Sequence, residues 1–313
     1  MAAAVAVIGA LDADVLVLTG VDYDHGHAAL AALQDRLAAA GHPYPHRFAL
    51  PPNTGVATGF DVDGDGRSRG ARDAQGWGRF AGAGGMAVLS RLPVDAAGAV
   101  DHSAFLWADL PRTLSPDPPE LRAVQRLSTT GHWQVPLRLA EGRVLTLLVW
   151  AATPPVFDGP GDRNGRRNHD EAAFWQHLID GELRLPPPAA PFVLIGEAQL
   201  DPVDSNGRPA ALRALLSHPA LSDPAPRGMA ARSDAGQGGD PATDTVLYDF
   251  GGLRASYVLP SADLRVGGAG VLWPDAGNPL AATLATASRH RPVWVDLFTL
   301  SGPDAPRSPA ASP

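Results

Sequence analysis

The sequence predicts a single mixed α/β domain, and three observations carry the prediction. The chain has 313 residues, a length that many α/β sandwiches and barrels reach as one unit. Hydrophobic residues make up 45% and charged residues 19%, a globular composition with ample material for a core. Strand-like and helix-like segments alternate without a linker between two folding units. We therefore expect one domain over residues 1–298 and a disordered tail, rich in Pro, Ser and Ala, over 299–313.

Hydrophobic periodicity predicts the helices. Residues 27–40 carry leucines at helical spacing on one face, and Gly41 ends the pattern. Residues 169–180 have an apolar face of the same kind, with Asn168 as the predicted N-cap and Glu171 completing a capping box. Two further helices, favoured by alanine content, are predicted at 2–11 and 209–217.

Short apolar runs between turn residues predict the strands. The β-branched run at 14–18 is bounded by Asp and Gly, and the run FVLIG at 192–196 is typical of a central, buried strand. A long stretch rich in glycine and aspartate, 51–85, precedes the next strand. The remaining strands are predicted at 86–90, 134–139, 144–150, 256–259, 270–273 and 293–297.

Charge and missing residue types exclude several classes of protein. Basic residues number 25 and acidic residues 33, a net charge of −8, so a nucleic-acid partner is not expected. The absence of cysteine excludes disulfides, thiolate zinc sites and cysteine nucleophiles. Every basic residue is arginine, which removes Schiff-base lysine chemistry. No apolar run reaches the ~18 residues of a membrane span.

The N-terminal residues carry no recognisable export signal. They lack a basic region and a clean small-residue cleavage site, so a signal peptide is not predicted. The default expectation is a cytoplasmic protein, or an exported one if the natural chain begins further upstream.

An acidic run inside the glycine-rich stretch predicts a calcium loop. Asp61, Asp63 and Asp65 alternate and are followed by Gly66. In such loops the side chains at positions one, three and five converge on a hard cation. Position twelve, where a glutamate is expected, is Arg72, although an aspartate comes next. The alternative to bound Ca²⁺ is a solvated acidic turn.

Seven long segments, spread over residues 15–297, carry a family resemblance. They are VDYDHGHAAL, PPNTGVATGFDVDGDGR, DAQGWGRFAGAGGMAVLSRLPV, LSTTGHWQVPL, TPPVFDGPGDRNGRRNHDEAAFW, LRASYVLPS and ASRHRPVWVDL. In them the chain resembles a bacterial subgroup of the endonuclease/exonuclease/phosphatase superfamily, metal-dependent phosphoesterases with a deoxyribonuclease-like fold. The resemblance implies a four-layer α/β/β/α sandwich with two packed, mostly antiparallel sheets, and Mg²⁺ or Mn²⁺ as the cofactor.

The resemblance also places the site residues, and most of them are substituted. The metal-binding glutamate corresponds to Gly20 and the central histidine to Ala151. In the loop that is usually Gly-Asp-x-Asn, Glu197 stands for the aspartate and Gln199 for the asparagine. The family's first strand, which carries an asparagine, is not represented, because the chain begins at the helix that follows it.

The site positions nearest the C-terminus are also substituted. Ser256 corresponds to the aspartate that orients the terminal histidine, and Arg289 replaces the aspartate just before that histidine. Only His290 is unchanged. Without an orienting carboxylate, His290 is expected to lose control of its tautomer.

These substitutions favour an inactive or crippled family member that binds an anionic or phosphorylated ligand. Arginine forks bind phosphate without a metal. The residues predicted to contact the ligand are Arg163, Arg166, Arg167, Asn168 and Arg289.

Two alternatives remain at this point. One is an active phosphoesterase in which Glu197, Asp201 and His290 rebuild a metal site. The other is an interaction protein that uses the 51–85 loop.

Overall fold

The computed structural model describes residues 1–229 and 236–298; the predicted tail, 299–313, lies outside the described residues. A five-stranded sheet lies at the centre, in the order β10-β7-β6-β5-β4. Its neighbouring strands are antiparallel, except that β6 and β7 are parallel. The strands are β4 (Val100–Asp101), β5 (Gly131–Arg138), β6 (Val144–Ala151), β7 (Phe192–Glu197) and β10 (Ser256–Pro260).

Two smaller sheets pack on the inner face of this central sheet. One has the order β1-β3-β2, with β1 (Val15–Val21), β2 (His46–Phe48) and β3 (Gly85–Ser90), and the other pairs β11 (Val266–Val271) with β12 (Val293–Leu297). Side chains of β1 and β12 join the same apolar cluster as those of β6 and β7. In the described residues, β1 and β12 each keep one edge without a paired strand. A separate hairpin joins β8 (Val246–Tyr248) to β9 (Gly251–Leu253).

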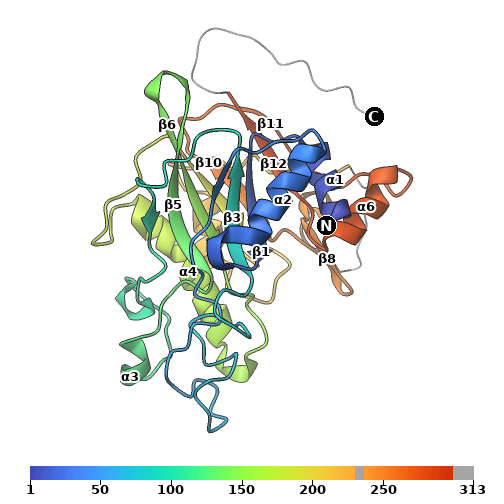
Figure 1. Ribbon diagram of the computed structural model, residues 1–313. Coiled ribbons are helices and arrows are strands. Elements are labelled where there is room, and N and C mark those ends of the chain that lie inside the picture. The colour runs from blue at the N-terminus through green and yellow to red at the C-terminus, as the bar shows by residue number, and fades with distance from the viewer. Residues whose placement is uncertain (230–235, 299–313) are drawn as a thin grey trace.

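Helices cover both outer faces, which completes the four-layer sandwich that the resemblance implies (Figure 1). On one side, α1 (Ala2–Leu11) and α2 (Ala28–Ala39) cover the β1-β3-β2 sheet. On the other, α4 (Arg163–Ile179) and α5 (Ala210–Leu216) cover the central sheet. The remaining helices are α3 (Pro119–Arg122) and α6 (Pro279–Ala287), and single 3₁₀ turns lie at His25–His27, Trp107–Asp109, Ala140–Gly142, Gly159–Gly161 and Pro241–Thr243.

Alternation along β6 explains why the core is divided into two clusters. Leu147 and Val149 point to the inner face and meet the smaller sheets. Leu148 and Trp150 point to the outer face and meet α4 and α5. A strand buried on both faces is apolar throughout, as the run at 144–150 is. Each predicted helix and strand has a counterpart, although the strand predicted at 270–273 is the end of β11, Val266–Val271. None of the described helices is long and apolar enough to cross a bilayer.

The start of the helix predicted at 169–180 is wrong. The helix begins at Arg163, so Asn168 and Glu171 lie inside it and are buried rather than capping it. Glu171 accepts hydrogen bonds from the backbone N–H groups of Thr129 (2.5 Å) and Thr153 (2.8 Å). These polar residues face the interior because the loops beside α4 have buried backbone groups that need partners.

A histidine is buried beside this helix. His132 is 1% exposed and lies against the rings of Trp150, Phe174 and Trp175. Burial lowers the pKa of His132 from 6.5 to about 3. Burial acts on Glu171 in the opposite direction and raises its pKa to about 7, against the charge of Arg167.

We expect His132 to make the fold sensitive to acid. As the pH falls below 6.5 the unfolded chain takes up a proton on this histidine, whereas the folded chain does not until about pH 3. Each pH unit in this window costs about 1.4 kcal/mol, so His132 should remove about 2 kcal/mol between pH 7 and pH 5. Glu171, with its raised pKa, stabilises the fold as the pH falls, so the histidine must be isolated by comparison.

Denaturant unfolding of the wild type and of His132→Gln at both pH values makes that comparison. The wild type should lose about 2 kcal/mol more than the variant between pH 7 and pH 5. Equal losses would contradict the assignment to His132.

Candidate functional site

The last residues of β6 and β7 and the first residue of β10 lie side by side in the central sheet. They are at the end of the sandwich where the long loops gather (Figure 1). Glu197 is paired in register with Ala151 of β6 on one side and with Ser256 of β10 on the other. Residues two apart on a strand share a face, so all three continue the inner-face rows of Val149, Ile195 and Val258. The structure therefore brings together three positions that the resemblance assigns to the site.

A carboxylate and an imidazole meet at this point. His290 Nδ1 lies 2.9 Å from Glu197 Oε1, within ion-pair distance, although neither atom makes a well-aligned hydrogen bond. The Thr19 hydroxyl, at the end of β1, donates to Glu197 Oε2 at 2.9 Å. The Glu197 side chain thus joins the two sheet layers and the segment just before β12. Glu197 is 8% exposed, so its carboxylate is largely removed from water.

A carboxylate lies beside His290, although not from the position that the resemblance indicates. Ser256 supplies none, but the longer Glu197 side chain reaches the ring from the adjacent strand. An aligned hydrogen bond to Nδ1 would fix the ring and leave Nε2 available to a ligand; here the two atoms are 2.9 Å apart without that alignment.

Gly20 lies at a break in β1. The register of β1 with β3 shifts between Thr19 and Val21, and Gly20 takes a left-handed φ of +72°. A residue with a Cβ is strained in that conformation. The backbone here therefore favours glycine and offers no side-chain ligand at this position.

A cation and two aromatic rings lie near His290, around the neighbouring residue Arg289. The guanidinium Cζ of Arg289 lies 5.4 Å from the centroid of the Tyr248 ring. The Phe250 ring stacks on Tyr248, with centroids 5.1 Å apart and an interplanar angle of 8°. Burial raises the pKa of the Tyr248 hydroxyl, the Glu197 charge raises it further, and Arg289 opposes the rise. Arg289 is exposed, and within the described residues its guanidinium makes no hydrogen bond or ion pair.

The loop after β7 does not bring Asp201 into a common ligand group with Glu197 and His290 in the described residues. Asp201 is buried, and its carboxylate accepts hydrogen bonds from the backbone N–H groups of Val203, Asp204 and Arg254, at 2.7 to 2.8 Å. These hydrogen bonds hold the turn in which Asp201 lies. Gln199 is half-buried, and its backbone has a φ of +54°.

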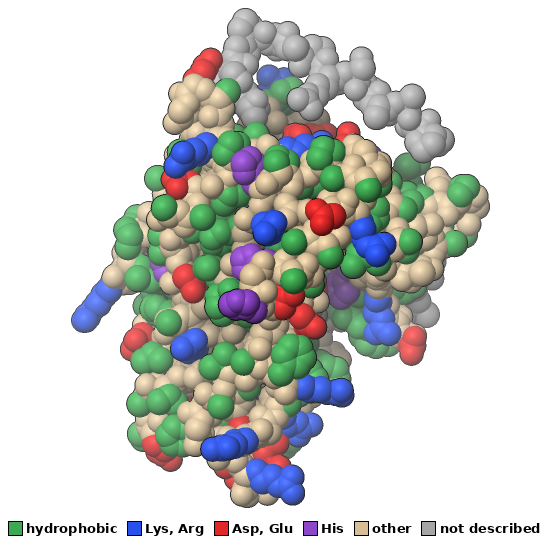
Figure 2. All heavy atoms as spheres, viewed as in Figure 1, with side chains coloured by type: hydrophobic (Ala, Val, Ile, Leu, Met, Phe, Trp, Pro, Cys, Tyr) green, Lys and Arg blue, Asp and Glu red, His purple; other side chains and the backbone are tan. Residues whose placement is uncertain are grey.

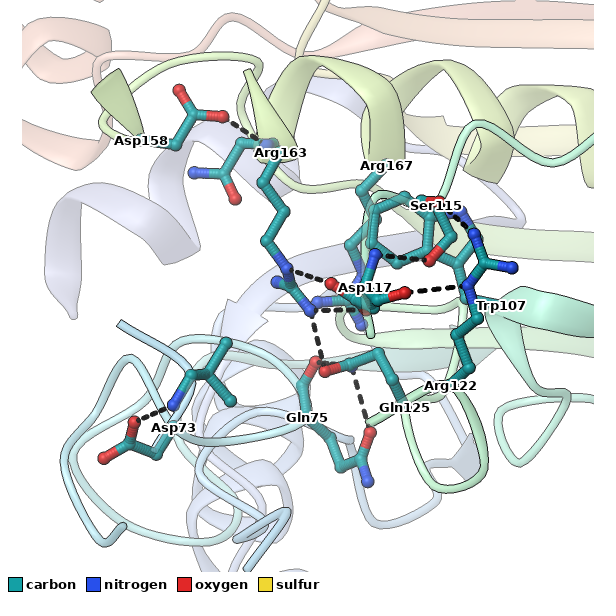
Figure 3. Close-up of polar contacts among 12 residues, drawn as sticks. Asp73, Gln75, Trp107, Ser115, Asp117, Arg122, Gln125, Asp158, Arg163 and Arg167 are labelled. Atoms are coloured by element: carbon teal, nitrogen blue, oxygen red, sulfur yellow. Dashed lines mark hydrogen bonds and ion pairs between the residues drawn. The ribbon is translucent and has the colours of Figure 1, made fainter. Parts of the chain in front are cut away.

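Two of the predicted anion-binding arginines are engaged by the protein itself. Arg163 donates to both carboxylate oxygens of Asp117, at 2.8 and 3.0 Å, and to Gln125 at 2.9 Å (Figure 3). Arg167 is 3% exposed and donates to the backbone carbonyls of residues 126–128. Both guanidinium groups therefore stabilise the packing of α4 against the loop that precedes β5.

Asn168 and Arg166 lie on the same helix. Asn168 Nδ2 donates to the carbonyls of Thr153 and Ala198, both at 2.7 Å, and so joins the loops after β6 and β7. Arg166 is half-buried, and its guanidinium forms no hydrogen bond or ion pair with the described part of the chain. Of the three helix arginines, Arg166 is the one whose donors are not already used within those residues.

The predicted calcium loop brings its three aspartates together. Ligand oxygens of Asp61, Asp63 and Asp65 lie within 4.8 Å of one another, and all three side chains are exposed. Asp61 accepts hydrogen bonds from the N–H groups of residues 64–66. Asp73, next to position twelve, is buried and accepts from the N–H groups of Val62 and Gly70, so it closes the loop.

The strand ends do not fit the Mg²⁺ or Mn²⁺ that the resemblance implies. Such hard cations take several oxygen ligands, usually including one or two free carboxylates. Here Glu197 Oε2 accepts a hydrogen bond from Thr19, and Oε1 lies 2.9 Å from His290 Nδ1 without an aligned hydrogen bond. Over residues 1–229 and 236–298, only Asp61, Asp63 and Asp65 form a group of three acidic or histidine side chains that could hold an ion.

Sequence reasoning missed Thr19, Tyr248 and Phe250. Thr19 directly precedes the position matched to a metal ligand, and alternation along β1 places it on the inner face. Tyr248 and Phe250 are two residues apart just before a glycine pair, a spacing that could have indicated an aromatic pair at a turn.

Comparison with known proteins gives one family. The sequence matches the Endonuclease/Exonuclease/phosphatase family over residues 1–290. The fold is similar to that of the endonuclease/exonuclease/phosphatase from Beutenbergia cavernae DSM 12333, with a TM-score of 0.55 and 17% identity. That match covers 94% of this chain and 64% of the other, so this chain spans less than two thirds of that protein.

A second similar structure is the endonuclease/exonuclease/phosphatase family protein from Leptotrichia buccalis C-1013-b. Its TM-score is 0.52 and its identity 16%, over 95% of this chain and 92% of that one. At this level of sequence identity, both similarities show the fold alone. No curated protein matches the chain. Because the family match extends over nearly the whole sequence, the chain belongs to the endonuclease/exonuclease/phosphatase family.

Proposed function

We propose that this protein binds an anionic, phosphorylated small molecule at the ends of β6, β7 and β10 and does not hydrolyse it by a metal-dependent route. The observation that carries the proposal is the contact between Glu197 and His290. It engages the one carboxylate at the strand ends, where Gly20 and Ala151 contribute no ligand.

The charges at the site support an anion rather than a cation. The Arg289 guanidinium is exposed beside His290, and no acidic side chain of the described residues pairs with it. A guanidinium offers planar, forked donors that match phosphate geometry. The net charge of −8 favours a small phosphorylated molecule over a long polyanion. Figure 2 shows basic and acidic side chains interspersed over one face of the molecule.

A second candidate function is hydrolysis without a metal. The contact between Glu197 and His290 favours it, because a histidine held by a carboxylate can act as a general base through its other ring nitrogen. In this case His290 would take a proton from water as the water attacks phosphorus and the P–O bond to the ester oxygen breaks. The imidazolium, stabilised by Glu197, would then return the proton to the oxygen of the departing alcohol.

We also propose that Asp61, Asp63 and Asp65 bind Ca²⁺. Their oxygens converge to within 4.8 Å, and Gly66 occupies the position where a calcium loop turns sharply. This site lies on an exposed loop and would stabilise that loop rather than take part in phosphate chemistry.

The first prediction concerns turnover. With Mg²⁺ or Mn²⁺, the purified chain should hydrolyse neither a generic phosphodiester nor an aryl phosphate above background. A phosphate-release assay with His290→Ala checks the result. His46→Ala is the matched control, because His46 lies on β2 at the end of the β1-β3-β2 sheet away from Thr19. Metal-stimulated turnover that His290→Ala abolishes would contradict the proposal. Turnover that needs no metal and is lost in Glu197→Gln would instead establish the second candidate.

The second prediction concerns Arg289. Inorganic phosphate should bind the wild type more tightly than Mg²⁺ does, and Arg289→Asp should raise the Kd for phosphate roughly tenfold, or about 1.4 kcal/mol. The variant should not gain hydrolysis, because Gly20 and Ala151 still supply no ligand. Calorimetric titration of both ions measures this, with Arg36→Asp on α2 as the control. Mg²⁺ binding that is tighter than phosphate binding would refute the anion site.

The third prediction concerns calcium. Ca²⁺ at millimolar concentration should raise the melting temperature by a few degrees, because a ligand that binds only the folded state stabilises it. Asp63→Ala should lose this response, whereas Asp35→Ala, an exposed aspartate on α2, should keep it. A melting temperature that does not respond to Ca²⁺ would leave the solvated turn as the correct interpretation.

A further inference from the structure

Three aromatic side chains are exposed on loops at the same end of the sandwich as the candidate site. Trp77 and Phe80 lie on the glycine-rich loop 51–85 and are 61% and 53% exposed. Phe157, on the loop after β6, is 82% exposed. The loop 51–85 forms the lower end of the molecule in Figure 1. Large rings stabilise a fold mainly when they are buried, so the stability of this fold does not explain them.

The backbone that carries Trp77 and Phe80 is rigid, because two segments of the loop cross closely. The Gly55 N–H donates to the Gly76 carbonyl at 2.9 Å. A Cβ on Gly55 would overlap the carbonyl oxygen of Phe80, and a Cβ on Gly76 would overlap the carbonyl oxygen of Thr129. Only glycine fits at these two positions. The exposed rings therefore stand on a closely packed part of the fold.

Phe157 adopts a backbone conformation that its side chain disfavours. Its φ is +73°, in the left-handed region where a Cβ is strained. Its ring is exposed, so packing does not compensate for the strain. Strain that the fold itself does not require points to a functional position.

A polar network joins the two loops that carry the rings (Figure 3). Gln75 Oε1 accepts a hydrogen bond from Gln125 at 3.1 Å, and Gln125 in turn accepts one from Arg163 at 2.9 Å. The next residue on α4, Asn164, donates to the Val156 carbonyl at 2.7 Å. The segments next to Trp77 and Phe157 are therefore held together at one end of the molecule.

Four exposed arginines accompany the rings on the loop 51–85. Their guanidinium groups form no hydrogen bond or ion pair with the described part of the chain; they are Arg67, Arg69, Arg72 and Arg79. They outnumber the three exposed aspartates of the same loop, and Figure 2 shows basic side chains at this lower end. Aromatic rings favour the headgroup region of a bilayer, and basic side chains are attracted to anionic lipids.

We propose that this end of the molecule docks on a membrane surface that contains anionic phospholipids. Trp77, Phe80 and Phe157 enter the headgroup region, and the four arginines contact lipid phosphates. Arg79 lies between two of the rings, and the third is on another loop, so the rings do not form one continuous apolar face. A lipid surface accommodates separate rings, whereas a stable protein partner requires a continuous complementary surface of about 800 Å². The proposal depends neither on the anion site nor on bound Ca²⁺.

Co-sedimentation of the full chain with lipid vesicles tests this surface. In EGTA, the wild type should bind phosphatidylcholine vesicles that contain about 30% phosphatidylserine more tightly than vesicles of phosphatidylcholine alone. Trp77→Ala should raise the Kd for the anionic vesicles about tenfold, because one large ring no longer leaves water. Arg79→Gln should raise it about fivefold, the effect of one basic residue near an anionic surface.

Phe298→Ala is the matched control. Phe298 is also exposed and also lies beside a guanidinium, that of Arg265 at 4.4 Å, but it follows the end of β12 that is far from the candidate site. Phe298→Ala should leave vesicle binding unchanged. Equal melting temperatures of the two alanine variants would show that both fold.

Two results with vesicles would overturn the proposal. One is a wild type that does not bind the anionic vesicles, and the other is binding that Trp77→Ala leaves unchanged. A single-stranded oligouridine of about ten nucleotides tests the other partner that combines stacking with phosphates. If the wild type bound this RNA and not the vesicles, and Trp77→Ala weakened the RNA binding, a nucleic acid would replace the membrane as the partner.

Discussion

The buried polar face of α4 is the constraint on which the site end of the molecule depends. Chain segments that leave β6 and β7, and the one that enters β5, have backbone groups that water cannot reach, and each such group needs a partner. Glu171 supplies acceptors for two of these N–H groups, while Asn168 and Arg167 supply donors to five carbonyls. One helix therefore fixes the geometry of three loops without help from any metal. A scaffold held in this way can keep its shape while the residues that it presents change.

Burial, and the need of buried polar groups for hydrogen-bond partners, explain where prediction from the sequence succeeded and where it failed. Strands such as 144–150 and 192–196 were predictable because their apolar character follows from burial on both faces. The start of α4 was not, because Asn168 and Glu171 have the residue types of a cap, and only loops distant in the sequence turn them inward. At the site, the resemblance placed Ala151, Glu197 and Ser256, and the sheet register brings them together. The contact of Glu197 with His290 could not be predicted from the sequence, since it depends on side chains that meet across two sheets.

Buried carboxylates in the described structure each have a partner of their own. Asp117 is paired with Arg163, Glu197 with His290, and Glu171 and Asp201 with backbone N–H groups. Removing a carboxylate from water is costly unless such partners compensate for the lost hydration. Carboxylates that bind a metal are hydrogen-bonded as well, but a site for a divalent ion brings its oxygen ligands together at one point. Of the four carboxylates named here, only Glu197 lies at the strand ends, and in the described residues these four do not gather at one point.

The two smaller sheets share one apolar core, yet β1 and β12 each present an edge without a partner strand in the described residues. Free edges are where backbone amides exchange hydrogen with solvent most readily, and where a strand from another molecule can add by main-chain pairing. The side chains on both strands are largely apolar, apart from Thr19 and Asp296. These two edges should therefore affect self-association at high protein concentration before they affect ligand binding.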